Sequence, residues 1–130
     1  GRWNHQGIPV LYTSSHISLA FLELLVNVDS FQLYGSFQIV GIQIPEEVTI
    51  KYMAESKMPK NWRSNENMRP LRDLGTTWQK QSKFLVLAVP SAVIPFEFNF
   101  LINPGHDNFK KIKIKTSSAL EIDQRFLLPE

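Results

Sequence analysis

The chain has 130 residues, which is enough for one domain with a real hydrophobic core and too few for two. Its 43% hydrophobic and 20% charged residues, with nine Phe, three Trp and three Tyr, exclude a disordered chain and are typical of a globular protein. It has no cysteine, which excludes disulfides and thiolate metal sites, and its net charge of +2 decides neither for nor against a nucleic-acid partner.

The first part of the chain predicts one helix among short strands. Segment 16–27 is apolar on nearly every side of a helix, so we expect it to be buried, and the hydroxyls at 13–15 are suited to cap it. The longest apolar stretch, 17–28, is interrupted by Glu23 and Asn27, so no stretch is long enough to span a membrane. Apolar and β-branched runs predict strands at 8–12, 37–44 and 48–52.

The second part predicts a long loop, a second helix and further strands. Residues 54–68 are polar and rich in Asn and basic side chains, which indicates a surface loop long enough to be mobile or functional. Pro70 suits the first turn of a helix at 70–80, where apolar residues recur at spacings of three and four. We expect strands at 84–89, 96–102, 111–115 (one face in water) and 120–126, with a turn at 103–106. These elements make one α+β domain, richer in strand than in helix.

Glu23 is the most informative residue on physical grounds. On the helix, its neighbours three and four positions away are Leu19, Ala20, Val26 and Asn27. A lone carboxylate among apolar residues must be desolvated, paired or directed into a cleft. Alternatively, Glu23 marks the edge where the helix meets water, and the residues alone leave both interpretations open.

Three further residues are candidates for ligand binding. Arg2 could hold a phosphate or carboxylate through two hydrogen bonds, and Tyr12 could stack on a flat ring. The alternatives are a solvated arginine and a tyrosine packed in the core. Ser91 follows Pro90 at the end of a buried strand, where ligands often sit, although such a serine commonly serves only the turn. Ser91 is not in a Gly-x-Ser-x-Gly motif, so we do not expect a hydrolase of that kind.

Other polar residues favour structural roles. We expect His106, in an Asn-Pro-Gly-His turn, to tie the turn to the backbone. Lys110, Lys111, Lys113 and Lys115 form a basic strand face that could follow phosphates, but lysines also protect edge strands from aggregation, and we favour that role. There is no glycine-rich dinucleotide motif, P-loop or paired-histidine zinc motif, and the three histidines are scattered, so we expect no metal site.

Five short motifs occur in order along the chain. They are Gly-Arg-Trp-Asn at 1–4, Val-Leu-Tyr-Thr-Ser at 10–14, Leu-Glu-Leu-Leu-Val at 22–26, Val-Pro-Ser-Ala-Val at 89–93 and Asn-Pro-Gly-His at 103–106. Each is weak alone, but together, with their spacing and the tryptophan-bearing helix between them, they resemble the RES domain, named for its Arg, Glu and Ser residues. The resemblance covers essentially the whole chain, so we expect residues 1–130 to form a single RES domain. The family also carries a segment before the first motif, with another active-site arginine, and we expect that segment to be missing here.

The resemblance implies a fold like that of ADP-ribosyltransferases, with a mixed β-sheet core and a few helices around an NAD cleft. It also implies a bacterial toxin that depletes NAD, its substrate, and is held inactive by a cognate helix-turn-helix antitoxin of the Xre-like type. By this match the active-site candidates are Glu23, Arg2, Tyr12 and Ser91. Asn103 matches a family motif too, but we interpret it, like His106, as structural.

The working hypothesis is cleavage of the nicotinamide–ribose bond through a transition state like an oxocarbenium ion, as in other glycoside cleavages. Glu23 would stabilise the developing positive charge or orient a ribose hydroxyl, and Arg2 would clamp the pyrophosphate. Tyr12 would stack on or border the nicotinamide, and Ser91 would hydrogen-bond the ribose or the phosphates. Nicotinamide is a good leaving group, so no metal is required. The acceptor stays open between water, inorganic phosphate and a protein side chain, which gives an NAD glycohydrolase or phosphorylase for the first two.

Two alternatives stand behind this hypothesis. A protein ADP-ribosyltransferase ranks second, and a non-catalytic module that binds a partner or nucleic acid ranks third. We expect a cytoplasmic protein with no membrane association, which contacts nucleic acid only through its antitoxin. A homodimer within a larger complex is one arrangement consistent with these expectations.

Overall fold

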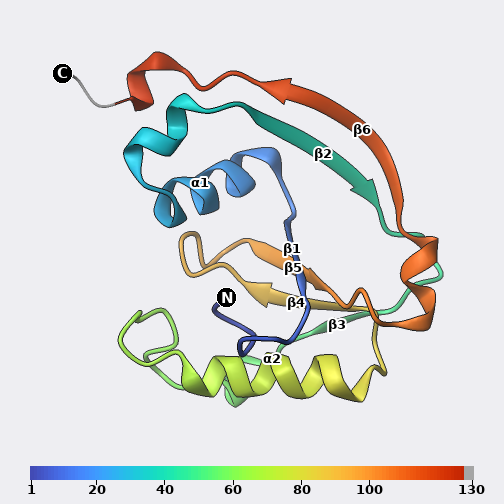
Figure 1. Cartoon of the computed structure of the whole chain (residues 1–130). Coiled ribbons are helices and arrows are strands. Elements are labelled where there is room, and N and C mark those ends of the chain that lie inside the picture. Colours follow the sequence, from blue (N-terminus) through green and yellow to red (C-terminus); the bar gives the residue numbers. More distant parts are fainter. Residues whose placement is uncertain (128–130) are drawn as a thin grey trace.

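The computed structural model describes residues 1–127 and contains two helices and two β-sheets (Figure 1). The helices are α1 (Ile17–Asn27) and α2 (Arg69–Gln81). The strands are β1 (Leu11–Ser14), β2 (Phe37–Gln43), β3 (Ile50–Tyr52), β4 (Val86–Pro90), β5 (Phe98–Ile102) and β6 (Lys113–Leu120). Four short 3-10 helices lie between them: η1 (Ser30–Tyr34), η2 (Glu55–Lys57), η3 (Asp107–Lys111) and η4 (Gln124–Phe126). The α+β prediction is confirmed.

The larger sheet has the strand order β1-β5-β4-β3 and is mixed, because β3 pairs parallel to β4 while the other pairs are antiparallel. The smaller sheet is the antiparallel β2–β6 ribbon, with an irregularity between Gly41 and Ile42. Figure 1 shows α2 along one side of the larger sheet and α1 between that sheet and the ribbon. No helix in the described part of the chain is long and apolar enough to cross a membrane.

The core has two parts, one on each face of β4, whose five residues are all buried. Toward α2, Leu87 and Leu101 pack with Leu71 and Trp78 of the helix and with Trp3. On the other face a second cluster forms around three buried residues of the sheet and its approach, Leu85, Val86 and Ile102. Burying one leucine side chain contributes about 1.5–3 kcal/mol, so the first cluster holds the sheet against α2.

The helix at 16–27 is found almost as predicted, but the expectation that it is buried on nearly every side is wrong. Leu19 alone is fully buried among its residues, whereas Ile17 is 65% and Val26 63% exposed. The physical reason for Val26 is that its face of α1 borders a cavity instead of the core. The predicted hydroxyl cap is also absent, since His16 occupies the cap position without a side-chain bond.

Other element boundaries differ from the sequence predictions at the two ends of the chain. The first strand begins at Leu11 instead of residue 8, because a turn in which Ile8 N donates to His5 O precedes it. The strand predicted at 120–126 is not found in the described chain, where β6 ends at Leu120 and residues 124–126 form η4. Leu120 pairs with Phe37, the first residue of β2, so β2 has no residue left to pair with the chain beyond Leu120.

The lysine-rich segment also differs from its prediction. Lys110 and Lys111 belong to η3, so the four lysines do not share one strand face. Lys113 and Lys115 lie on β6, whose residues are exposed on both faces up to Ala119, because this ribbon has only two strands. The prediction of a strand with one face in water is therefore wrong in that detail.

Candidate active site

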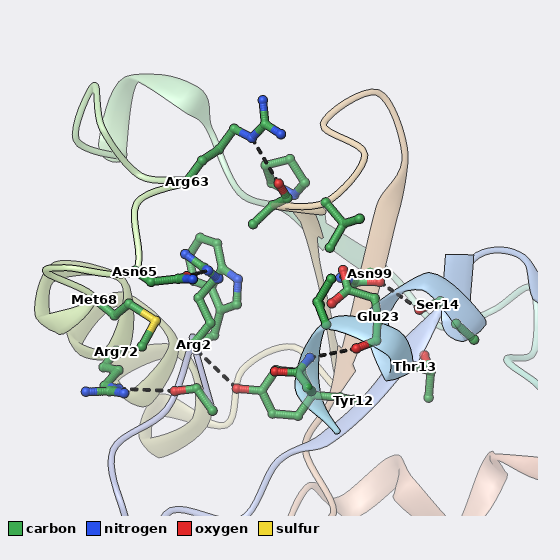
Figure 2. A pocket seen from close by; sticks show the side chains of 18 residues that line it. Arg2, Tyr12, Thr13, Ser14, Glu23, Arg63, Asn65, Met68, Arg72 and Asn99 are labelled. Carbon is green, nitrogen blue, oxygen red and sulfur yellow. Dashed lines mark hydrogen bonds between the residues drawn. The ribbon is translucent and has the colours of Figure 1, made fainter. Parts of the chain in front are cut away.

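A cavity of about 940 Å³ opens where the larger sheet, α1 and the loop before α2 meet (Figure 2). Its walls come from distant parts of the sequence: residues 1–3, the end of β1, one face of α1, the segment 63–72 and the ends of β4 and β5. In Figure 2, Glu23 and Asn99 lie on one side, and Arg2, Asn65 and Arg72 on the other. The cavity thus has a carboxylate on one wall and guanidinium groups facing it across the opening.

Glu23 reaches this cavity from α1, on the helix face that also presents Ala20, Val26 and Asn27. These residues are three or four positions from Glu23, so a single stripe of the helix borders the cavity. The Ser91 hydroxyl donates to Glu23 Oε1 at 2.8 Å, and the Asn99 amide donates to the same oxygen at 2.9 Å. Among residues 1–127, Glu23 Oε2 has no hydrogen-bond partner. Glu23 is therefore a paired carboxylate in a cleft, the first of its two sequence interpretations.

Ser91 is fully buried, and its hydroxyl has no remaining hydrogen-bonding capacity. While it donates to Glu23, it accepts from the backbone N–H groups of Val93 and Ile94, each at 3.0 Å. One proton and two lone pairs are all that a hydroxyl has. In this structure Ser91 is therefore a support for Glu23, and direct contact between Ser91 and a ligand stays a prediction.

Arg2 ties the start of the chain to the loop before α2. Its terminal nitrogens donate to the carbonyls of Trp62 at 3.1 Å and Ser64 at 3.4 Å, and to the side chain of Asn65. Burial lowers the pKa of Arg2 from its ordinary value, the Glu23 carboxylate opposes this shift, and Arg72 adds to it. The guanidinium is thus held in place before any ligand arrives.

Tyr12 presents part of its ring while its hydroxyl is fixed. The side chain is 41% exposed at the edge of the cavity. Its hydroxyl accepts from the backbone N–H of Trp3 at 3.1 Å and donates to Asn4 Oδ1. Burial raises the pKa of Tyr12, while the Trp3 hydrogen bond and the Arg72 charge act in the opposite direction. Tyr12 therefore has a fixed hydroxyl and an accessible ring instead of being packed in the core, and its stacking on a ligand ring stays a prediction.

Several polar residues of the cavity were not predicted from the sequence, among them Arg63, Arg72 and Asn99. Arg63 Nε donates to Ala92 O at 2.9 Å and Arg72 Nε to Gly1 O at 3.2 Å. Within the described chain, the terminal guanidinium nitrogens of both residues make no hydrogen bond. The signal for Arg63 was its place in a long polar loop, and the signal for Asn99 was a polar residue inside an apolar strand. Nothing in the helical pattern distinguished Arg72.

Asn103 and His106 hold a turn, as predicted. Asn103 is buried, its amide donates to Gln79 O at 3.0 Å, and its Oδ1 accepts from Gly105 N at 2.9 Å. His106 Nδ1 accepts from Asn108 N at 3.0 Å and so caps η3. Over the described residues, no three His, Asp or Glu side chains cluster as metal ligands would.

The fold and the site define an α+β domain with a carboxylate-bearing, arginine-lined cavity. Residues 1–126 match the RES domain, and the chain belongs to the RES-domain family. It is 38% identical over 110 residues to Toxin Res of Yersinia enterocolitica, and the matched region covers 85% of this chain and 72% of that relative. It is 34% identical over 129 residues to Toxin Res of Photorhabdus laumondii, covering 98% and 81%. It is 32% identical over 129 residues to a Prs ADP-ribosylating toxin of Sphingobium, covering 98% and 80%.

Proposed function

We propose that this RES-domain protein is a toxin that cleaves the bond between nicotinamide and ribose in NAD. The observation that carries the proposal is the Glu23 carboxylate, with one oxygen fixed by two donors and the other unpaired at a cavity. The carbon–nitrogen bond breaks with its electron pair going to nicotinamide. The ribose carbon then bonds to an acceptor, which is water in a glycohydrolase and inorganic phosphate in a phosphorylase.

Glu23 is the proposed catalytic residue because positive charge develops on the ribose as the bond breaks. A carboxylate oxygen already oriented toward the ribose stabilises this charge without reorganising in the transition state. The cavity volume of about 940 Å³ lies within the range of about 300–1,000 Å³ that small-molecule sites span, near its upper end, which suits a dinucleotide.

The arginines are the proposed diphosphate ligands. Arg2 was the sequence candidate, and its guanidinium is already bound to Trp62, Ser64 and Asn65. We therefore propose that Arg2 neutralises part of the negative charge of the diphosphate and holds the loop at 62–65 in its conformation. Arg63 and Arg72 keep terminal nitrogens for a bidentate contact. Tyr12 would border the nicotinamide ring, and Ser91 would keep Glu23 in place.

A second candidate is a protein ADP-ribosyltransferase, in which a protein side chain is the acceptor. The observation that favours it is the 32% identity to the relative named a Prs ADP-ribosylating toxin. Both candidates release nicotinamide and need the same carboxylate, so they differ only in the group that attacks the ribose.

We further propose that residues 1–130 act as a single domain in the cytoplasm, where a helix-turn-helix antitoxin of the Xre-like type covers the cavity. Relatives named as toxins support the antitoxin as a partner. An antitoxin that bound the protein without slowing NAD loss would contradict this part of the proposal.

The test is NAD turnover by the purified protein with and without inorganic phosphate, with every product identified by mass. Free nicotinamide is the expected common product; ADP-ribose, its 1-phosphate or a labelled protein then identifies the acceptor. Glu23→Gln should remove turnover, whereas Glu121→Gln, an exposed carboxylate beyond β6, should not. Turnover that survived Glu23→Gln in a folded protein would refute the assignment.

A further inference from the structure

We infer that Asn99, with Ser14 behind it, is a positioning residue that fixes the plane of the Glu23 carboxylate, so that one of its oxygens faces the cavity. The inference deepens the proposed function, because it assigns the orientation of the proposed catalytic carboxylate to a residue outside the Arg, Glu and Ser set. Asn99 acts through Glu23, so it is a positioning residue and not a catalytic one.

The strand register brings this pair together. Ser14, the last residue of β1, is the direct partner of Asn99 on β5, and Asn99 is also opposite Val89 on β4. Side chains of directly opposed residues project to the same face of a sheet. Ser14 and Asn99 therefore meet beside the end of β4, where the chain turns into the buried Ser91.

The contacts of Asn99 fix which end of its amide faces Glu23. The Ser14 hydroxyl donates to Asn99 Oδ1 at 2.7 Å, and Asn99 Nδ2 donates to Glu23 Oε1 at 2.9 Å. An amide is the side-chain group that offers an acceptor and a donor at its two ends. An aspartate in the same place could accept from Ser14 but would direct an oxygen, not an N–H, at the carboxylate.

Two donors on one oxygen restrain the carboxylate plane of Glu23 more tightly than a single donor does. With the Ser91 bond alone, the carboxylate plane could tilt about the last side-chain bond while that hydrogen bond is kept. Because Asn99 and Ser91 approach the same Oε1 from two different chain segments, such a tilt weakens at least one of the two bonds. Hydrogen bonds to a charged group are about twice as strong as those between neutral groups, so the two together hold one orientation. Oε2 is then left for the ribose.

The pairing of β1 with β5 does not depend on the Asn99 side chain, so a positioning role of Asn99 can be distinguished from a structural one. The β1–β5 ladder runs from Leu11 opposite Ile102 to Ser14 opposite Asn99, and Thr13 adds a side-chain bond to Phe100 O. The strands therefore pair without the Asn99 amide. Loss of that amide should change the rate of the chemical step more than it changes folding.

The experiment measures kcat and KM for NAD in four variants: Asn99→Asp, Asn99→Ala, Ser14→Ala and Ser117→Ala. Ser117→Ala is the matched control, since Ser117 also bonds a cross-strand amide, that of Gln38, but on the β2–β6 ribbon away from the cavity. We expect kcat to fall about a hundredfold in Asn99→Asp and about tenfold in Asn99→Ala, with KM changed less than about threefold. Ser14→Ala should lower kcat by about threefold or more, and Ser117→Ala should match the unmodified protein.

Crystal structures of the unmodified protein and Asn99→Ala supply a readout that does not depend on activity. In Asn99→Ala the Glu23 carboxylate should rotate or occupy two orientations while the Ser91 bond is kept. The inference is overturned if Asn99→Ala keeps its kcat, if it alters only KM, or if Glu23 is unmoved in the crystal. If the unmodified protein releases no nicotinamide, the proposed function fails, and the crystal comparison still decides whether Asn99 orients Glu23.

Discussion

Gly75 is the point where α2 contacts the backbone that carries Arg2, so we expect Gly75→Ala to affect stability and the cavity together. A Cβ at residue 75 would lie 2.7 Å from the carbonyl carbon of Trp3 and 3.0 Å from its Cβ, with the carbonyl oxygen closer still. Ordinary contacts of a Cβ begin at 3.4 Å. The neighbour is backbone, and the Trp3 side chain is only 2% exposed in the core, so neither partner can move aside freely.

The expected cost is at the upper end of the range of about 1–3 kcal/mol that overpacking a core usually causes. Urea denaturation measures it, and an unchanged slope with a lower midpoint would show that stability alone has changed. The matched control is Gly105→Ala, where the added Cβ meets only Asn103 Oδ1 at 3.4 Å. We expect that control to stay within about 0.5 kcal/mol of the unmodified protein.

The same displacement should raise KM for NAD, because Arg2 directly precedes Trp3 and its bonds to the loop at 62–65 depend on the position of Trp3. The assay is NAD turnover under conditions where denaturation curves show Gly75→Ala to be folded. Equal stability and equal KM in Gly75→Ala and Gly105→Ala would refute the claim that this contact sets the cavity wall.

Three other predictions follow from the same structure. Leu101→Ala should lower the free energy of unfolding by about 2–5 kcal/mol in urea, because Leu101 is fully buried between the sheet and α2. Arg2→Ala should raise KM for NAD about tenfold and speed proteolysis within 60–68, since the loop loses three acceptor contacts; equal cleavage rates would contradict this. The raised pKa of Tyr12 disfavours its ionised form in the folded state. The stability from this shift is therefore complete below about pH 10 and lost as pH rises through the folded-state pKa. Tyr12→Phe should flatten the alkaline fall in the free energy of unfolding, and an unchanged fall would exclude Tyr12 as its source.

The sequence predicted those elements whose local pattern reflects their burial. The spacing in α2 reflects contact with one neighbouring layer, and the continuous apolar run in β4 reflects burial on both faces, so the local pattern alone identifies both. The prediction for the segment after Leu120 was wrong. Its apolar residues suit a strand, but a strand also needs a pairing partner, and β2 does not provide one there. Local pattern also cannot tell a helix face in the core from one that lines a cavity, which is why Val26 was expected to be buried.

The candidate site was predicted only where a residue conflicted with its surroundings or resembled a family motif. Glu23 stood out because a carboxylate interrupted an apolar helix, and the structure brings it together with Arg2, Tyr12 and Ser91. Arg72 could not be found, because its place in the cavity depends on how the start of the chain crosses α2. Asn99 needed the β1–β5 register, which no local pattern gives.

The bonds at the cavity join residues very far apart in sequence, and this has a consequence for synthesis of the protein. Arg2 and Trp62 are 60 positions apart, Glu23 and Ser91 are 68 apart, and Ser14 and Asn99 are 85 apart. Contacts of such long range form only after the intervening chain exists, and they slow folding. Until Asn99 on β5 has been translated, Glu23 lacks at least one of its two donors. The cell that makes this protein therefore meets an oriented carboxylate only after residue 99 has been made, and a partner has that interval in which to bind first.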